Sequence, residues 1–323
     1  MTETLAVEGL RVRLPTPGGD VTVVDGIDYT VRPAEVLGIA GESGSGKTVS
    51  MLALLGLLPE GSAVEGRAQF GADDLLAIPP RRLRDISGRD IAMVFQDPFT
   101  SLHPMLSVGK QLTEHVRQHL GLDRGQAEAR AVELLADVRI PDPHAALRRF
   151  PHQFSGGMRQ RIAIAIALAC RPRLLIADEP TTALDVTVQA GILRLLDRLR
   201  REHDLAVVLI THDLGVLSSV ADRVAIFYAG RIVESGARED VLQRPRHPYT
   251  RALLDALPHP EAPKERDLVA IKGSPPTPGR IPPGCAFHPR CAYLIEDCRH
   301  VVPPLAGAGD RRLACHVDPF TRA

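Results

Sequence analysis

Positions 41–48 read GESGSGKT, whose residue types and spacing suit the binding of a nucleoside triphosphate. The glycines let the backbone curl, so that successive N–H groups can point at phosphate oxygens. Lys47 would reach the β- and γ-phosphates, and the Thr48 hydroxyl would ligate Mg²⁺. The residues predicted to contact the nucleotide in this loop are Gly41, Ser43, Gly44, Ser45, Gly46, Lys47 and Thr48.

The lysine in this loop stands out against the rest of the chain. Only four of the 39 basic residues are lysines. A lysine at position 47 therefore suggests that a compact ammonium is needed there rather than a planar guanidinium. A glycine-rich turn that binds no ligand would not need a lysine at this position.

Two carboxylates end the apolar segment LLIADEP at positions 174–180. In open α/β sheets, ligands bind beyond the carboxyl ends of the strands. Asp178 is suited to hold Mg²⁺, mostly through water, and Glu179 would polarise the attacking water. On its own the segment could be a plain surface turn. The phosphate-binding loop elsewhere in the chain favours the catalytic interpretation.

Two further polar residues follow apolar runs. His212 follows VVLIT and could hydrogen-bond a γ-phosphate, although a lone histidine is more often structural. Gln96 follows IAMVF and could reach the magnesium or the water. We therefore predict Mg²⁺ ligation through Thr48, Gln96 and Asp178.

The segment FSGGMRQR at positions 154–161 predicts a second helix start that can bind an anion. Ser155 is a good N-cap, and the glycines allow close approach of the backbone to a phosphate. A second such site makes most sense if it serves the nucleotide of another copy across an interface. The alternative is an ordinary capped helix.

The elements that must position these residues are short apolar runs and amphipathic helices. VLGIA, LLIA and VVLIT are apolar throughout, which favours a parallel sheet covered on both faces. Residues 186–202 and 125–138 have the pattern of amphipathic surface helices. The sequence therefore predicts an α/β fold.

Length and charge limit the possible functions. The 323 residues suggest two domains, or one large domain with an appendage. A formal net charge of zero argues against a protein that binds nucleic acid mainly by neutralising phosphates. The longest apolar run, at 162–170, is too short to span a membrane. The N-terminus MTETLAVEGL does not resemble a signal peptide, so we expect a cytoplasmic chain.

The composition changes near residue 257. Residues 258–284 contain eight of the 27 prolines, which predicts an extended linker or wrapping arm. Four cysteines then follow, whereas Cys170 ends an apolar run and is expected to be buried. Clustered cysteines in a reducing compartment more often bind metal than form disulfides. These four are Cys285, Cys291, Cys298 and Cys315.

The order of the motifs resembles that of the ATP-binding subunits of ABC transporters over about residues 5–257. The segments that carry this resemblance are GESGSGKT, Gln96, FSGGMRQ, LLIADE, the ALD turn at 183–185 and His212. It implies a P-loop NTPase (ABC ATPase) with a mostly parallel core sheet, an antiparallel β subdomain and a helical subdomain at about 97–165. A small irregular cysteine-bearing extension would follow at 258–323.

The resemblance also implies roles for individual residues. Two ATPase domains would enclose two ATP molecules head to tail, with Glu179 as the catalytic carboxylate and His212 as the switch histidine. Asp185 would signal across the dimer. The residues that would contact ATP bound to the partner subunit are Ser155, Gly156, Gly157 and Gln160.

Three positions depart from the family pattern. Phe154 stands where leucine is usual, and Met158 where glutamine is usual. Both substitutions resemble the peptide-importer branch. Residues 11–24 lack the aromatic residue that stacks on adenine, so Leu14 would take its place or adenine would be held loosely.

Further segments resemble the oligopeptide and dipeptide importers. These are residues 97–115, RPRHPYTRALLDALP at 244–258, and GCAFHPRC at 284–291. The resemblance implies an ATPase that energises peptide import. Its partners would be a second ATPase subunit, two membrane permease subunits and an extracytoplasmic substrate-binding protein. Its place would be the cytoplasmic face of the membrane. Nickel or other small-solute importers remain an alternative.

Some members of this branch carry a [4Fe–4S] cluster, and four thiolates suit one. The spacing C-x5-C-x6-C-x16-C fits neither zinc ribbons nor ferredoxin runs. We favour an iron–sulfur cluster over zinc and over unliganded or disulfide-linked thiols. The cluster would stabilise the fold of the extension at 258–323, which we call the tail.

Two functions from other classes are less well supported. A soluble ABC-type ATPase acting on nucleic acid or ribosomes would usually carry tandem ATPase domains, a coiled coil or a basic surface. This chain has one phosphate loop and no heptad stretch. A tail that senses redox state and gates transport is supported by the cysteines alone.

Overall fold

The computed structural model describes residues 3–97, 101–182, 184–257 and 270–320. The chain divides into two compact units, each assembled from segments distant in sequence. The first unit consists of Met1–Leu5, Thr30–Val36 and Gln69–Ile210, and the second of Ala6–Tyr29, Leu37–Ala68 and Thr211–Ala323. The predicted boundary at 257/258 borders residues 258–269, which lie outside the described residues, so the division into 1–257 and 258–323 stays a prediction.

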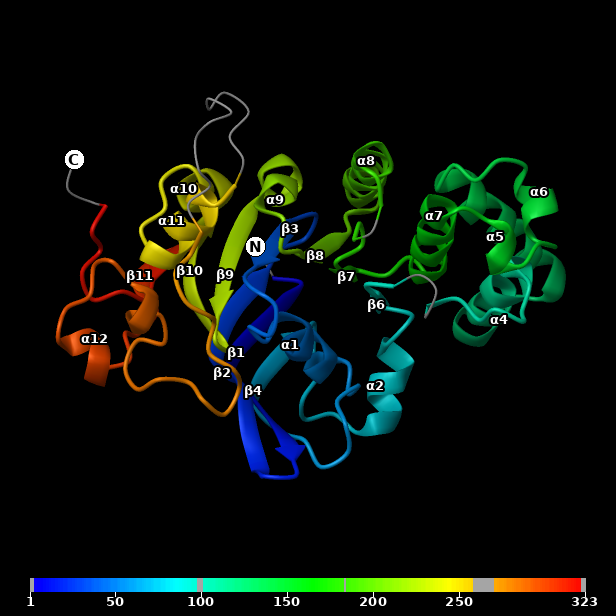
Figure 1. The fold of residues 1–323 in the computed structure, drawn as a ribbon. Coiled ribbons are helices and arrows are strands. Elements are labelled where there is room, and N and C mark those ends of the chain that lie inside the picture. The colour runs from blue at the N-terminus through cyan, green and yellow to red at the C-terminus, as the bar shows by residue number, and fades with distance from the viewer. Residues whose placement is uncertain (1–2, 98–100, 183, 258–269, 321–323) are drawn as a thin grey trace. The chain divides into compact units, whose positions relative to one another are not determined.

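The first unit is built on three parallel strands, β6, β7 and β8 (Figure 1). Ile91 of β6 pairs with Leu174 of β7, and Leu174 pairs in turn with Ala206 of β8. The strands of this unit are β5 (Asp73–Asp74), β6 (Ile91–Val94), β7 (Leu174–Asp178) and β8 (Ala206–Ile210). All residues of β7 and β8 are buried. The prediction of parallel strands from the runs LLIA and VVLIT is confirmed.

The helices of the first unit are α2 (Pro80–Ile86), α4 (Val108–Leu120), α5 (Arg124–Asp137), α6 (Pro143–Ala146), η1 (Pro151–Gln153), α7 (Gly156–Ala167) and α8 (Val186–His203). Two of them, α5 and α8, form where the sequence predicted amphipathic helices at 125–138 and 186–202. Helix α8 buries Ile192, Leu195 and Leu199 on one face, as its sequence predicted. Asp123 begins α5 in a capping box with Gln126, which satisfies two backbone donors that the helix leaves open.

The second unit contains the phosphate loop and the C-terminal part of the described chain. Its strands are β1 (Leu5–Thr16), β2 (Gly19–Val31), β3 (Val36–Ala40), β4 (Ala63–Phe70), β9 (Arg223–Tyr228), β10 (Arg231–Ala237), β11 (Ala306–Ala308) and β12 (Arg311–Leu313). Its helices are α1 (Lys47–Leu54), α9 (Leu214–Val220), α10 (Arg238–Leu242), α11 (Pro248–Asp255), η2 (His288–Arg290) and α12 (Asp297–His300).

Strand β3 is fully buried and runs parallel to β9, with Leu37 opposite Arg223. This strand is the run VLGIA that the sequence predicted. The phosphate loop begins at its carboxyl end and leads into α1. The loop therefore starts from a rigid, buried element, as the binding of phosphate by backbone groups requires.

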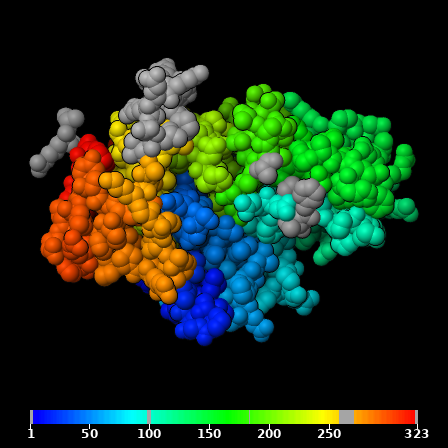
Figure 2. All heavy atoms as spheres, viewed as in Figure 1, coloured from blue at the N-terminus to red at the C-terminus, as the bar shows by residue number. Residues whose placement is uncertain are grey.

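The tail joins the sheet of the second unit through a hairpin. Strand β12 pairs antiparallel with β10, Glu234 lying opposite Leu313, and β11 pairs with β12. Figure 2 shows the tail, coloured orange and red, as a continuous layer beside the yellow segment that precedes it. An extension expected to be irregular thus contributes two strands.

A buried carboxylate holds the segment RPRHPYT against this sheet. Glu234 of β10 is 1% exposed and accepts hydrogen bonds from the N–H groups of Arg246 (2.8 Å) and His247 (3.0 Å). His247 is also buried, and burial lowers its pKa to about 4, so the ring is neutral near pH 7. Its Nδ1 accepts from the N–H of Tyr249 and caps α11. The cap fixes where α11 begins.

The backbone of the tail passes close to itself at position 284, which requires a glycine there. Gly284 has φ +68°, and a Cβ there would lie 2.4 Å from the carbonyl oxygen of Cys298. The N–H of Cys285 donates to the same oxygen (2.9 Å). Only a residue without a side chain allows this close approach.

Among the residues that the structure describes, none of the helices combines the length and the apolar character needed to cross a bilayer.

Candidate functional site

The phosphate loop curls around the ammonium group of Lys47. Lys47 is 6% exposed, and its Nζ donates to the carbonyl oxygens of Gly41 (2.8 Å) and Glu42 (3.0 Å). A third contact joins Nζ to Ser45 Oγ at 3.4 Å. The ammonium group therefore lies inside the curl of the loop, held by two carbonyl oxygens and a hydroxyl.

The loop ends at a left-handed residue that begins α1. Gly46 is the N-cap with φ 98°, and a Cβ there would lie 2.7 Å from the carbonyl oxygen of Val23. From outside, the N–H of Gly230 donates to the carbonyl oxygen of Ser45 (3.0 Å). Val23 and Gly230, from other segments of the same unit, thus support the curl of the loop.

His212 belongs to the same unit as the phosphate loop. Its side chain is exposed, and it lies between Thr211, whose N–H donates to Ile39 O (3.1 Å), and Asp213, which caps α9. The neighbouring residues are therefore fixed while the imidazole stays accessible. Its role as a switch stays a prediction.

The first unit brings Gln96 and Glu179 together, as expected for residues that follow parallel strands. Gln96 Nε2 donates to Glu179 Oε2 at 2.8 Å, and Thr182 Oγ1 donates to the same oxygen at 2.9 Å. Asp178, the last residue of β7, is 4% exposed. The parallel register places the ends of β6 and β7 at one edge, which explains the contact.

The backbone of Glu179 adopts an unusual conformation. Its φ is +45°, in the left-handed region that side chains disfavour, and its N–H donates to Ile210 O (2.9 Å). Such strain persists only where the surroundings impose it, and it gathers at functional sites. Here it fixes the direction of a carboxylate that two side-chain donors also orient.

The segment FSGGMRQR begins α7 as predicted. Ser155 is exposed and is the N-cap, and its Oγ accepts from the N–H of Met158 at 3.4 Å. Gly156 and Gly157 are half-buried, and a Cβ on Gly157 would lie 2.5 Å from Val188 Cγ1. Packing against α8 therefore already requires one of the two glycines.

Gln160 differs from the other predicted signature residues because it points inward. It is 1% exposed, and its Nε2 has no hydrogen-bond partner among the described residues. Contact of this side chain with a nucleotide on another subunit stays a prediction. Phe154 is also buried and packs under the guanidinium of Arg149, 4.4 Å from the ring centroid.

Asp185 caps α8. Its carboxylate accepts from the N–H of Val188 at 2.9 Å. The ALD turn is only partly visible, because Ala183 lies outside the described residues. Capping gives Asp185 a structural task beside its predicted role in signalling.

Comparison with known proteins complements this geometry. The family described as "ABC transporter" matches residues 24–182, and the family described as "Oligopeptide/dipeptide transporter, C-terminal region" matches residues 233–298. The chain is 46% identical over 311 residues to the oligopeptide transport ATP-binding protein OppD of Salmonella typhimurium, covering 96% of this chain and 92% of the relative.

The chain belongs to the family of oligopeptide and dipeptide ABC transporter ATP-binding proteins. The dipeptide transport ATP-binding protein DppD of Bacillus subtilis is 47% identical over 305 residues, covering 94% of this chain and 91% of the relative. As a member of this family, the chain is an ATPase of the ABC class.

Solved structures show the same fold. The dimeric, post-hydrolysis structure of the ATP-binding cassette MJ0796 bound to ADP and Pi has a TM-score of 0.65 and 24% identity, covering 72% of this chain and 98% of that one. CbiO1 from Clostridium perfringens has a TM-score of 0.63 and 26% identity, covering 76% and 92%. The predicted fold class is confirmed.

The predicted magnesium ligands suit an ABC ATPase chemically. A hydroxyl, an amide and a carboxylate supply the oxygen donors that Mg²⁺ prefers, and the Asp178 carboxylate ends a buried strand beside Glu179. Leu14, predicted to replace the adenine-stacking residue, lies half-buried in β1. Its contact with adenine stays a prediction.

The four tail cysteines gather but do not form a recognisable ligand set. All are free thiols, as is Cys170, which is buried as predicted and whose pKa burial raises to about 11. Burial, and then the charges of the three other tail thiols, raise the pKa of Cys285 to about 11. No group of three or more His, Cys, Asp or Glu within the described ranges is arranged to hold a metal ion. The expected [4Fe–4S] cluster has no support in this geometry.

Sequence reasoning did not assign roles to three residues that the structure places at the functional elements. Thr182 orients Glu179, and Tyr249 and Arg290 contact the phosphate loop. Tyr249 and Arg290 lie in the segments RPRHPYT and GCAFHPRC, which resemble the importer branch. Nothing local in them indicates a partner more than 200 residues away.

The two tasks of Asp185 can be separated by substitution. Asp185→Asn keeps an oxygen that can cap α8, so we expect a midpoint of thermal unfolding close to that of the wild type. We expect its ATPase activity to fall, because the charge is lost. Asp185→Ala should also lose about 1 kcal/mol of stability with the cap. Calorimetry and phosphate release measure the two effects. Full activity of Asp185→Asn would leave capping as the only role.

Proposed function

We propose that this chain hydrolyses MgATP to energise the import of dipeptides or oligopeptides through a membrane permease complex. The observation that carries the proposal is the match of residues 233–298 to the C-terminal region of oligopeptide/dipeptide transporters. It extends the likeness beyond the ATPase core, and relatives named for oligopeptide and dipeptide transport align with nearly the whole chain.

In this proposal the phosphate loop holds the triphosphate. The backbone N–H groups of residues 41–48 and the Lys47 ammonium bind the β- and γ-phosphates. Mg²⁺, when bound by Thr48, Gln96 and Asp178, neutralises charge on the phosphate oxygens. His212 donates a hydrogen bond to the γ-phosphate.

Glu179 acts as the base for the attacking water. Its carboxylate takes a proton from the water, whose oxygen forms a bond to the γ-phosphorus as the bond to the β–γ bridging oxygen breaks, and that oxygen leaves with ADP. ADP and phosphate leave. The hydrogen bonds from Gln96 and Thr182 support this role, because they fix the carboxylate oxygen that faces them.

The second part of the proposal is a pair of ATPase subunits. The N-terminus of α7, with Ser155, Gly156, Gly157 and Gln160, would contact ATP bound by a second, homologous ATPase subunit. The exposure of Ser155 supports this contact. Closure would follow ATP binding, because each nucleotide then bridges two chains and stabilises their association. Asp185 would signal between the subunits.

The remaining partners follow from the same proposal. Two permease subunits would receive the motion, and an extracytoplasmic protein would deliver the substrate. The chain would sit at the cytoplasmic face of the membrane as a peripheral subunit. Residues 1–257 would form the ATPase domain, with the helical subdomain at about 97–165, and residues 258–323 the extension.

The substitution Glu179→Gln tests the proposed chemistry. We expect ATP to bind normally while phosphate release falls more than 100-fold, because an amide cannot take up the proton. Uptake of a labelled dipeptide into vesicles that contain the complete complex should stop as well. Asp197→Asn is the matched control, since Asp197 pairs with Arg200 and Arg201 on the surface of α8 and should leave turnover unchanged. Near-normal ATPase activity of Glu179→Gln would refute the assignment of the base.

An iron–sulfur cluster on the four tail thiols remains part of the proposal. This part of the proposal rests on the number of thiols, since four thiolates suit such a cluster, and no step of hydrolysis depends on it. We expect anaerobically purified protein to contain four irons per chain and a visible charge-transfer band. Protein that lacks both, or that contains stoichiometric zinc, would contradict it. Cys291→Ser is the variant in which iron should be lost.

A further inference from the structure

The phosphate loop of this ATPase contains a carboxylate of its own. Glu42 is the second residue of the loop, and its carbonyl oxygen accepts from Lys47 Nζ at 3.0 Å. A negative side chain beside a site for a triphosphate is unfavourable unless a nearby positive charge compensates it. The residue that pairs with Glu42 therefore affects how tightly the loop can bind ATP.

That partner is an arginine of the tail. Arg290 lies 248 residues further along the chain and forms a two-pronged ion pair with Glu42. Its Nη1 lies 2.7 Å from Oε2, and its Nη2 lies 2.9 Å from Oε1. The side chain of Arg290 is 5% exposed and that of Glu42 24%. A two-pronged ion pair that is largely shielded from water is stronger than an exposed pair with a single contact.

The guanidinium is held from its other sides as well. Arg290 Nε donates to the carbonyl oxygen of Lys272 (3.0 Å), and Nη1 also donates to the Tyr228 hydroxyl (3.2 Å). The hydrogen bonds to Glu42 raise the pKa of Arg290 above its ordinary value. The positive charge is therefore permanent and fixed in place.

A second contact joins the C-terminal region to the same loop residue. The N–H of Glu42 donates to the hydroxyl of Tyr249 at 2.9 Å. Tyr249 is fully buried, and burial raises the pKa of its phenol, so the hydroxyl stays neutral. The backbone and the side chain of Glu42 are thus each held by a different segment.

An aromatic cluster makes both contacts rigid. Tyr228, Tyr249 and Phe287 pack with ring centroids 4.5 to 5.4 Å apart, and each is at most 2% exposed. Phe287 belongs to GCAFHPRC, and Arg290 follows it by three residues. Burial of the Phe287 ring therefore sets the position from which Arg290 reaches the loop.

We propose that Arg290 is a positioning residue for ATP. It neutralises the carboxylate of Glu42 and holds the phosphate loop in the shape that receives the triphosphate. The C-terminal region thereby sets the affinity of its own subunit for ATP. The inference rests on the proposed ATPase function and adds a role for the tail in it.

The charge of Glu42, rather than docking of the tail, is the reason that Arg290 changes the affinity for ATP. Without Arg290, a residue of the phosphate loop would carry an uncompensated negative charge, which would oppose the binding of phosphates. Removal of the Glu42 carboxylate should then restore the affinity. A purely structural Arg290 would not be rescued in this way, because the tail would remain loosened.

Steady-state ATPase assays on the full-length chain in its complex test this. We expect Arg290→Ala to raise the KM for ATP about tenfold, with kcat changed less than about twofold. The double variant Glu42→Gln/Arg290→Ala should return KM to within about twofold of the wild type. The KM difference between Arg290→Ala and the wild type should shrink at high salt, since screening weakens the repulsion.

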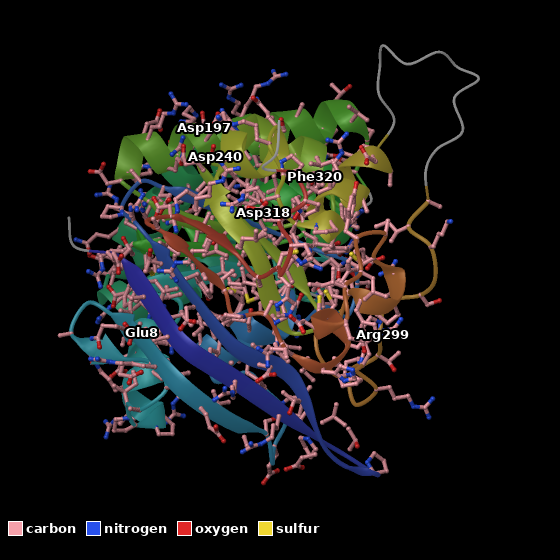
Figure 3. The ribbon with its side chains drawn as sticks, turned by 90° about the vertical axis from the view of Figure 1, so that its left-hand side faces the viewer. Glu8, Asp197, Asp240, Arg299, Asp318 and Phe320 are labelled. Carbon is pink, nitrogen blue, oxygen red and sulfur yellow. The ribbon has the colours of Figure 1, made fainter. Side chains whose placement is uncertain are left out.

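The matched control is Arg246→Ala, which removes an ion pair with Asp318 in the same C-terminal region (Figure 3 labels Asp318). We expect its KM for ATP to be unchanged even if its midpoint of thermal unfolding falls. An unchanged KM in Arg290→Ala, no rescue by Glu42→Gln, or an equal rise in KM in Arg246→Ala would each overturn the inference. A wild-type chain without any ATPase activity would instead contradict the proposed function.

Discussion

The Lys47 ammonium, enclosed by the backbone of residues 41–48, is the interaction on which the rest of the structure depends. A buried cation surrounded by carbonyl oxygens is favourable only where the backbone is held in one shape. Strand β3 supplies the fixed start of the loop, and Gly46 supplies the left-handed residue at which α1 begins. The contacts that surround the loop keep it curled. We propose that a loop held in this shape presents its N–H groups to the phosphates without further rearrangement.

The same demand explains why the tail is more than an appendage. A loop that carries its own carboxylate needs a compensating charge, and the loop itself offers only Lys47, which we propose binds the phosphates. Arg290 supplies the second positive charge from a segment that burial of Phe287 has already fixed. The hairpin of β11 and β12 and the carboxylate of Glu234 then hold this segment to the sheet. Binding of nucleotide and packing of the C-terminal region are therefore linked through one residue, Glu42.

Local patterns predicted most of the elements. The runs VLGIA, LLIA and VVLIT became strands because they are apolar on both faces, and parallel pairing then explains why Gln96 meets Glu179. The helix at 186–203 followed from its amphipathic period. What could not be predicted depends on contacts between distant residues. Nothing near Arg290 indicates Glu42, and nothing in the pattern of α7 indicates that Gln160 points inward. The cysteine spacing likewise does not reveal that the thiols gather without forming a ligand set within the described ranges.

If ATP hydrolysis by this chain energises peptide import, transported peptides should stimulate that hydrolysis in the complete complex. The measurement is phosphate release by the complete complex in lipid vesicles, with the substrate-binding protein present and with di- and oligopeptides or Ni²⁺ added in turn. We expect peptides to raise the rate several-fold and Ni²⁺ to leave it unchanged. Stimulation by Ni²⁺ alone, or a rate indifferent to every peptide length, would contradict the proposed function.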